Sequence, residues 1–224
     1  MYYQTERELQ SVLVNLDFGI STFKTKPMIR REISIGGCKP DVVCVHFMNQ
    51  ADIVLSQFQW SYKHVYVIWL LRKWHRLTSE TISLISFEKP DRINLIIGDL
   101  IRSHIVIQKE TGELTLSDFM LGIQAEVIAV EAKLFRWKEA IKQAKRYQMF
   151  ADKVFVAMDV DGVPKEQEIV ALFEDLGIGL CVVLPTGLEW IVNPRTNTYS
   201  IGHEREYIIA SVINPSHQLL WSRR

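Results

Sequence analysis

The residues most suited to chemistry lie at the end of a β-branched run, Val127–Leu134, in which Glu131 and Lys133 are two residues apart. Side chains alternate between the two faces of a strand, so Glu131 and Lys133 share one face. A carboxylate beside an ammonium group can hold a divalent cation together with a water molecule or a phosphate. The spacing is common, and an isolated pair of this kind is more often an ordinary surface ion pair.

Two further acids precede this run. Asp41 follows Pro40 and opens an apolar strand with Val43 on its own face, although a single residue in this position is more often a turn Asp. Glu6 lies at the edge of the apolar face of a helix predicted for residues 2–16, where it is either a solvated surface acid or a side chain that points into a site. Glu8 points elsewhere.

The elements that must position these acids alternate between strands and helices. Strands are predicted at 28–35 and 41–47 around a glycine-rich turn, and a helix at 137–149 follows the strand 126–134. The later part predicts a strand at 153–158, a helix from Pro164 to near Gly177, strands at 179–184 and 188–192, and an apolar segment at 207–213 that docks on the core. Asp159–Gly162 is a turn, because most ligand positions of a calcium loop are missing. His46 has no second His or Cys at ligand spacing and is predicted to be structural.

The stretch between the two parts of this pattern has a different character. Helices are predicted at 61–76, after Thr78 or Ser79, and at 91–102, followed by strands 105–107 and 114–116 around a glycine turn. This is the order of a winged helix, with the third helix in the position that reads DNA. Residues 61–109 hold eight basic and four acidic side chains, which suits phosphate contacts. The third helix is mostly apolar, so a module that fills a core and binds protein is the alternative.

Composition excludes several classes of protein. The 224 residues carry 26 basic and 26 acidic side chains, so the overall charge does not indicate a nucleic-acid partner. The three cysteines form no CxxC pair, which argues against structural zinc and a disulfide framework. The first residues do not resemble a signal peptide, and the longest apolar run is too short to span a bilayer. A cytoplasmic protein without a membrane partner is expected.

Taken in order, Glu6, Pro40-Asp41 and Glu131-Ala132-Lys133 resemble the motifs of the PD-(D/E)xK nuclease superfamily. The run Thr5–Leu9 is similar to the opening of archaeal Holliday-junction-resolvase-type members, in which the first Glu is catalytic, so Glu6 rather than Glu8 matches. The resemblance covers about 1–50 and 120–192. It departs from the compact family core because 89 residues separate Asp41 from Glu131.

This resemblance implies an α/β fold with a restriction-endonuclease-like mixed central sheet flanked by helices. The nuclease-like domain would comprise 1–50 and 120–224, and a winged-helix-like subdomain would be inserted at 51–119. The implied activity is metal-dependent DNA hydrolysis by Glu6, Asp41, Glu131 and Lys133. Mg²⁺ or Mn²⁺ would be bound by Asp41, Glu131, the Ala132 carbonyl and Glu6. Gln143 and Tyr147 would support the site. DNA would be contacted by basic side chains, namely Arg92, Arg102, Lys109, Lys138, Lys142, Lys145 and Arg146.

Restriction, phage defence, mobile-element and repair settings all fit such an enzyme, as does a homodimer or a larger defence or recombination complex. The main alternative is a nuclease-fold DNA-binding or complex-assembly protein without autonomous cleavage. The intact set of acids and lysine argues against that alternative. RNA cleavage is a third hypothesis.

Overall fold

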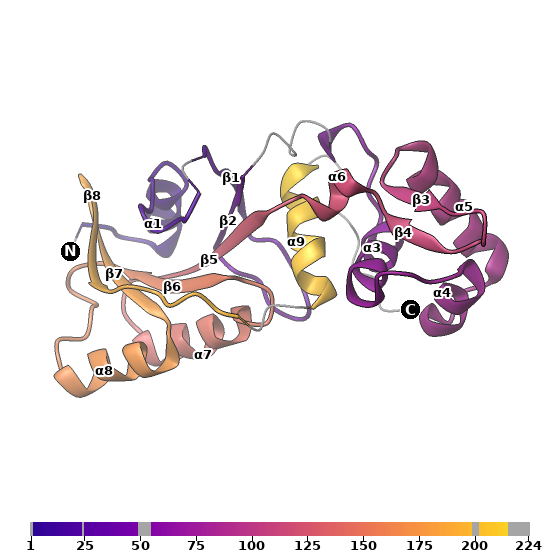
Figure 1. Ribbon diagram of the computed structural model, residues 1–224. Coiled ribbons are helices and arrows are strands. Elements are labelled where there is room, and N and C mark those ends of the chain that lie inside the picture. Colours follow the sequence, from indigo (N-terminus) through magenta and orange to yellow (C-terminus); the bar gives the residue numbers. More distant parts are fainter. Residues whose placement is uncertain (1, 24, 49–54, 199–201, 215–224) are drawn as a thin grey trace.

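The main sheet is mixed and has six strands in the order β1-β2-β5-β6-β7-β8 (Figure 1). The computed structural model describes residues 2–23, 25–48, 55–198 and 202–214. β5 and β6, and β6 and β7, are parallel, whereas the other neighbours are antiparallel. The strand bounds are β1 Met28–Arg31, β2 Val42–Phe47, β5 Ala125–Lys133, β6 Lys153–Met158, β7 Gly179–Leu184 and β8 Gly187–Val192. The predicted α/β class with a mixed central sheet flanked by helices is confirmed.

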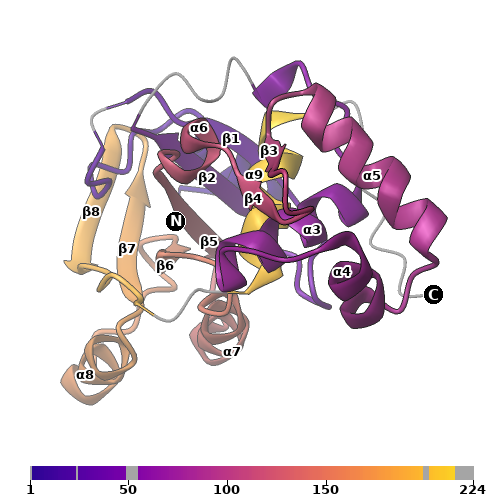
Figure 2. The same cartoon turned by 45° about the vertical axis from the view of Figure 1, so that its right-hand side comes forward.

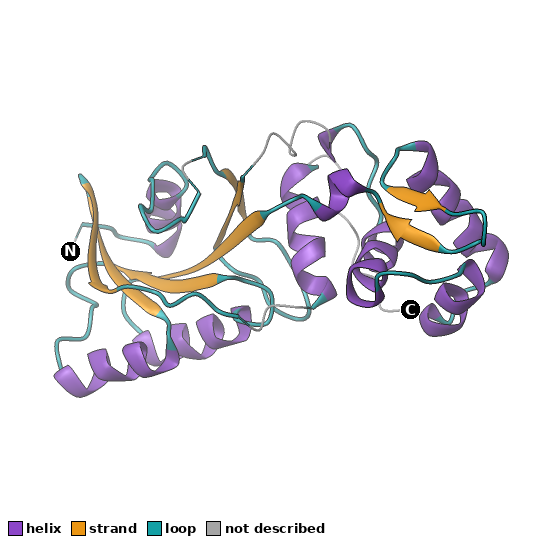
Figure 3. Ribbon diagram, viewed as in Figure 1, coloured by secondary structure: helices purple, strands orange, loops and turns teal. Residues whose placement is uncertain are grey.

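The central strand β5 is buried on both faces. Val127 and Ala129 belong to one core, which includes side chains of three helices, α7 (Trp137–Tyr147), α8 (Gln167–Leu176) and α9 (His203–Ile213). Ile128 and Val130 belong to a second core on the opposite face, covered by α1 (Glu6–Leu13). The middle of the strand, Val127–Val130, is apolar because neither of its faces meets water. In Figure 3, α7 and α8 lie on one side of the sheet and α1 on the other.

Two helices begin at residues other than those predicted from the sequence. The helix α1 begins at Glu6, capped by Thr5, because the backbone before it is extended and bound elsewhere. The helix α8 begins at Gln167, so the prediction that Pro164 lies in its first turn is wrong; Pro164 is buried in the loop before it. Gly177 ends α8 in the left-handed conformation that favours glycine.

Among the described residues of the long interval between β2 and β5, three helices and a hairpin follow one another in the predicted order. They are α3 (Tyr62–Trp74), α4 (Ser79–Ser86), α5 (Pro90–Arg102), β3 (Val106–Gln108) and β4 (Leu114–Leu116). Thr78 caps α4, as predicted, and Leu77 forms a bridge with Leu114 of β4. The hairpin is a separate two-stranded sheet, and a short helix not predicted from the sequence, α6 (Asp118–Leu121), leads back to β5. We call residues 55–121 the helical insert.

The helical insert lies beyond one end of the main sheet, with α9 between the two (Figures 1 and 2). α9 contacts α3 on one side and β1, β2 and β5 on the other. This contact confirms the prediction that the apolar segment 207–213 docks on the core. Within the described ranges, no helix is both long and apolar enough to cross a membrane.

Candidate active site

Four of the predicted site residues meet at the end of β5. Lys133 is at the centre of this group: its Nζ lies 2.8 Å from Oε1 of Glu131 and 3.3 Å from Oε2 of Glu6. Asp41 immediately precedes β2, next to the same end of β5. We refer to Glu6, Asp41, Glu131 and Lys133 as the carboxylate–lysine cluster. It lies at the carboxyl ends of the parallel strands β5 and β6, where sheets of this kind commonly bind ligands.

The carboxylate of Asp41 is fixed by two donors. Its Oδ2 accepts a hydrogen bond of 2.8 Å from the backbone N–H of Ala132, the residue between Glu131 and Lys133. Its Oδ1 accepts a 2.6 Å hydrogen bond from Nε2 of Gln10 on α1. The Gln10 amide is oriented in turn, because its Oε1 accepts from Arg31 at 3.2 Å.

The role of Gln10 was not predicted from the sequence. Gln10 is buried, and it follows Glu6 by four residues, which places the two side chains on one face of α1. The only indication of this role in the sequence is that Gln10, a polar residue, lies one helical turn after the candidate catalytic acid Glu6.

Glu131 is almost completely buried, with 1% of its surface exposed. Its Oε2 accepts a 2.5 Å hydrogen bond from the hydroxyl of Tyr147 on α7. Its Oε1 is buried, and among the described residues no donor is aligned to hydrogen-bond it, so its contact with Lys133 is an ion pair. The predicted supporting residue Tyr147 thus touches the cluster directly. Gln143 is half-buried one turn earlier on α7, and no hydrogen bond joins it to the cluster among these residues.

Burial and like charge raise the pKa values of both strand-end acids. Burial raises the pKa of Asp41, and the Ala132 N–H and Lys133 only partly oppose it. Burial and the charge of Asp41 raise the pKa of Glu131 despite the contacts with Lys133 and Tyr147. Burial alone would lower the pKa of Lys133, but Glu131, Asp41 and Glu6 together raise it. Lys133 is therefore protonated at neutral pH, and the acids still lack full compensation for their charge.

Tyr147 acts as a hydrogen-bond donor at all ordinary pH values. Burial and the charge of Glu131 raise the pKa of its phenol well above the ordinary value. The same hydroxyl also lies 3.3 Å from the carbonyl oxygen of Lys39, in the loop that precedes Asp41. Arg146, the preceding residue of α7, donates to the carbonyl of Gly37 at 2.6 Å. The helix α7 therefore holds both Glu131 and the loop that carries Asp41.

The donor set of the cluster suits a hard divalent cation. In the described part of the chain, no group of three His, Cys, Asp or Glu side chains is arranged to hold a metal ion. A cation here would rest on Asp41, Glu131 and the Ala132 carbonyl, with water completing its shell, because Glu6 is paired with Lys133. Mg²⁺ is commonly held by only one or two carboxylates. The raised pKa values of Asp41 and Glu131, and the absence of an aligned hydrogen-bond donor to Oε1 of Glu131 among the described residues, fit such a site.

The N-terminal segment is attached to the sheet by Asp159, which is fully buried directly after β6. Its Oδ2 accepts hydrogen bonds from the backbone N–H groups of Tyr2 (2.7 Å) and Tyr3 (3.0 Å). These bonds fix the chain just before α1 and so help to place Glu6. The turn predicted at Asp159–Gly162 is confirmed, since the N–H of Gly162 donates to the carbonyl of Asp159.

The predicted DNA-contacting residues do not converge on the cluster. Arg92 and Arg102 on α5 form ion pairs within the helical insert, with Glu88 and Asp99 respectively. Lys109 is exposed in the β3–β4 hairpin. The other predicted contacts are four basic side chains of α7, and all of them are exposed: Lys138, Lys142, Lys145 and Arg146. Nζ of Lys138 lies over the ring of Trp137.

The comparisons with known proteins add no relative. No family model, no curated protein and no solved structure matches this chain. A functional proposal therefore rests on the geometry and chemistry of the cluster.

Proposed function

We propose that this protein is a metal-dependent DNA endonuclease of the PD-(D/E)xK type, with a restriction-endonuclease-like core and a winged-helix-like insert. The observation that carries the proposal is the 2.8 Å hydrogen bond between Asp41 Oδ2 and the N–H of Ala132. It brings the Asp of one predicted motif against the residue between the acid and the lysine of the other. The two partners are separated by 91 positions in the sequence, so this contact is a property of the fold.

A divalent metal would be held by Asp41, Glu131 and the carbonyl of Ala132. In an extended strand the N–H and C=O of one residue point to the same side, so the Ala132 carbonyl is directed to the side where Asp41 lies. When bound, the metal would lower the pKa of a coordinated water and offset the charge that develops on the phosphate.

Lys133 would stabilise negative charge on the attacked phosphate. Its side chain is 12% exposed, which is enough to reach a substrate at the strand end while excluding most water. The neighbouring acids keep it protonated, and a fixed ammonium group in a partly dry site stabilises a developing anion strongly. Glu6, 41% exposed, would orient Lys133 and hold a second metal or its water.

The decisive experiment is a cleavage assay with plasmid, linear and branched DNA in the presence and absence of Mg²⁺ or Mn²⁺. Asp41→Ala and Glu131→Ala each remove a metal ligand, so cleavage should be lost. Lys133→Ala should retain metal and lose rate by about 100-fold or more. Lys165→Ala, at an exposed lysine outside the cluster, is the control and should cleave normally. Full activity of Lys133→Ala, or no cleavage by the wild-type protein under any of these conditions, would refute the assignment.

A specific observation favours a second role for the helical insert. Three large apolar side chains near the α4–α5 turn are highly exposed: Leu84 (75%), Phe87 (96%) and Leu95 (70%). Asp91 and Asp99 also lie on α5, so its outer surface is not uniformly basic. Exposed apolar patches of this kind commonly mark protein interfaces. The alternative function is therefore a nuclease-fold protein whose insert assembles with a protein partner.

A further inference from the structure

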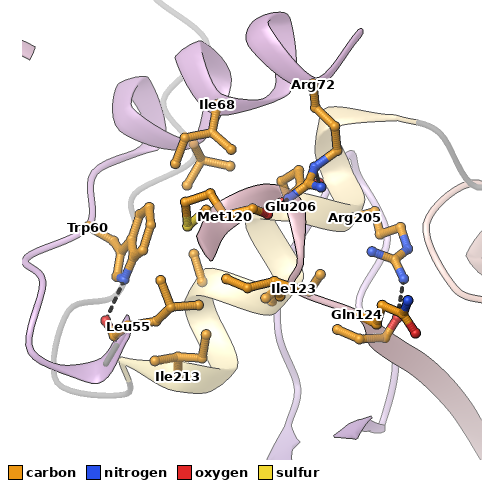
Figure 4. A pocket seen from close by; sticks show the side chains of 14 residues that line it. Leu55, Trp60, Ile68, Arg72, Met120, Ile123, Gln124, Arg205, Glu206 and Ile213 are labelled. Carbon is orange, nitrogen blue, oxygen red and sulfur yellow. Dashed lines mark hydrogen bonds and ion pairs between the residues drawn. The ribbon is translucent and has the colours of Figure 1, made fainter. Parts of the chain in front are cut away.

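A cavity of about 280 Å³ lies between the helical insert and α9, separate from the carboxylate–lysine cluster (Figure 4). Most of its wall is apolar, and Trp60, Ile68, Met120 and Ile209 are among the residues that line it. A cavity of about 150 Å³ accommodates benzene, so this volume admits a bicyclic aromatic molecule. Figure 4 shows Trp60 on one side and the polar residues Arg72 and Glu206 at the other end.

The polar end of the cavity offers a donor beside an acceptor. Nε of Arg72, from α3, lies 2.8 Å from Oε1 of Glu206, from α9. The Nε is buried at this contact and Nη2 donates to the carbonyl of Met120 at 3.4 Å, whereas the Arg72 side chain as a whole is 33% exposed, so its remaining N–H groups can donate to a ligand. Each carboxylate oxygen of Glu206 has more than one lone pair and can accept a further hydrogen bond. The pair is neutral overall, so the wall favours an uncharged polar ligand.

The other arginine in the cavity wall, Arg205, already has partners elsewhere in the protein. Arg205 donates to the carbonyl of Ala125 and forms an ion pair of 2.9 Å with Asp152. It is therefore held against the edge of the sheet, and an anionic ligand has no uncompensated cation to bind. A purely apolar ligand would remove water from the Arg72–Glu206 pair without offering it a hydrogen bond in return.

We infer that this cavity binds a planar heteroaromatic molecule of nucleobase size whose edge carries an acceptor next to a donor. Guanine is the nucleobase that fits: its O6 can accept from Arg72 while its N1–H and amino group donate to Glu206. Trp60 and Met120 supply the aromatic and thioether contacts that planar rings favour. Adenine presents an amino donor where guanine presents O6, so it would place a donor against Arg72.

Calorimetric titration of the full chain with guanosine, without metal, tests this inference. We expect saturable binding of one molecule, and adenosine should bind at least about tenfold more weakly because a buried donor would be left unpaired. Ala210→Leu fills the cavity and should weaken guanosine binding by at least about tenfold. Ala171→Leu makes the same change on the exposed surface of α8 and should have no effect.

A second variant guards against a folding defect in Ala210→Leu. Glu206→Gln nearly preserves side-chain shape, so it should fold and should lose most of the preference for guanosine over adenosine. Comparison of free guanosine with a short single-stranded oligonucleotide containing one guanine shows whether the base enters alone or as part of a strand.

Three results would overturn the inference: no saturable binding of guanosine or the oligonucleotide, unchanged affinity in Ala210→Leu, or an unchanged preference in Glu206→Gln. These experiments measure binding and not cleavage. Their outcome therefore does not depend on whether the protein proves to be a nuclease.

Discussion

Glu131 is a buried carboxylate whose negative charge is costly to the folded chain. Burial and the charge of Asp41 raise its pKa, so its ionised form is less favourable in the folded chain than in the unfolded chain. The cost is present above the raised pKa and is absent below the ordinary value near pH 4. A site that binds a cation tolerates this cost, because the cation removes it.

Glu131→Gln should therefore stabilise the metal-free protein at pH 7.5. The amide can still accept from Tyr147 and carries no buried charge. We expect a melting temperature about 2–4 °C higher than wild type, the change expected for about 1 kcal/mol in a chain of this length. The difference should shrink as the pH falls towards 4. Mg²⁺ should raise the melting temperature of the wild type only. A variant less stable than wild type at pH 7.5 in chelator would contradict this.

Glu6 and Glu8 should behave differently although they are two residues apart. Glu6 contacts Lys133, whereas Glu8 accepts a 2.8 Å hydrogen bond from the N–H of Gln4 and so fixes the backbone just before α1. Glu6→Ala should slow cleavage, less severely than Asp41→Ala, with little change in melting temperature. Glu8→Ala should cleave normally and lose about 0.5–1 kcal/mol of stability. Equal loss of activity in both variants would mean that the helix, not the contact, is required.

At the scale of elements, the helix α7 positions the residues of the site. It holds Glu131 through Tyr147 and the β1–β2 loop through Tyr147 and Arg146. Tyr147→Phe removes the hydroxyl while preserving the ring. We expect cleavage to fall by about tenfold and stability by about 1–2 kcal/mol, because a buried carboxylate oxygen loses its donor.

The control for Tyr147→Phe is Tyr2→Phe, because 55% of the Tyr2 surface is exposed. It should have wild-type activity and melting temperature. A positioning role for Tyr147 further predicts weaker metal binding in Tyr147→Phe, measured by titration with Mn²⁺. Unchanged Mn²⁺ affinity together with lower stability would assign Tyr147 a structural role alone.

Most elements could be predicted because their local patterns agree with their final environment. The strand β6 has the same bounds in the sequence and the structure, Lys153–Met158, since the buried residues after Lys153 form a continuous apolar run. The start of α8 could not be predicted, because Pro164 is equally compatible with a loop and with the first turn of a helix. The short α6 has four residues and no periodicity to recognise.

The site could be predicted only where residue type and order carried the information. The acids and lysine have distinctive types, and each was assigned to a strand end or a helix face. Gln10 and Asp159 contribute through contacts across 31 and 157 residues, which no local pattern contains. The near-complete burial of Glu131 follows from α7 and Tyr147 closing over the strand, and a strand pattern alone does not show it.

At the scale of the whole molecule, the partner of the helical insert separates the two candidate functions. If Arg92, Arg102 and Lys109 contact phosphates, the triple alanine variant should bind all DNA sequences more weakly. The slope of log affinity against log salt should become shallower by up to about 3, close to one per contact. Replacement of Lys138, Lys142 and Lys145 on α7 tests the second predicted DNA-contacting group in the same assay. Lys165→Ala, outside both groups, is the control. Unchanged DNA affinity in the first variant would favour a protein partner at the patch formed by Leu84, Phe87 and Leu95.

The position of the helical insert also has a consequence for how the chain folds. Phe47 and Ala125 are paired neighbours in β2 and β5, although the whole insert lies between them. Closing an unstructured loop of this length costs about 4 kcal/mol of chain entropy. The helices and hairpin of the insert are contiguous in sequence and can form early, which brings their two ends together. A preformed insert would then act as a short linker during synthesis, and the strands that carry the carboxylate–lysine cluster would pair soon after β5 leaves the ribosome.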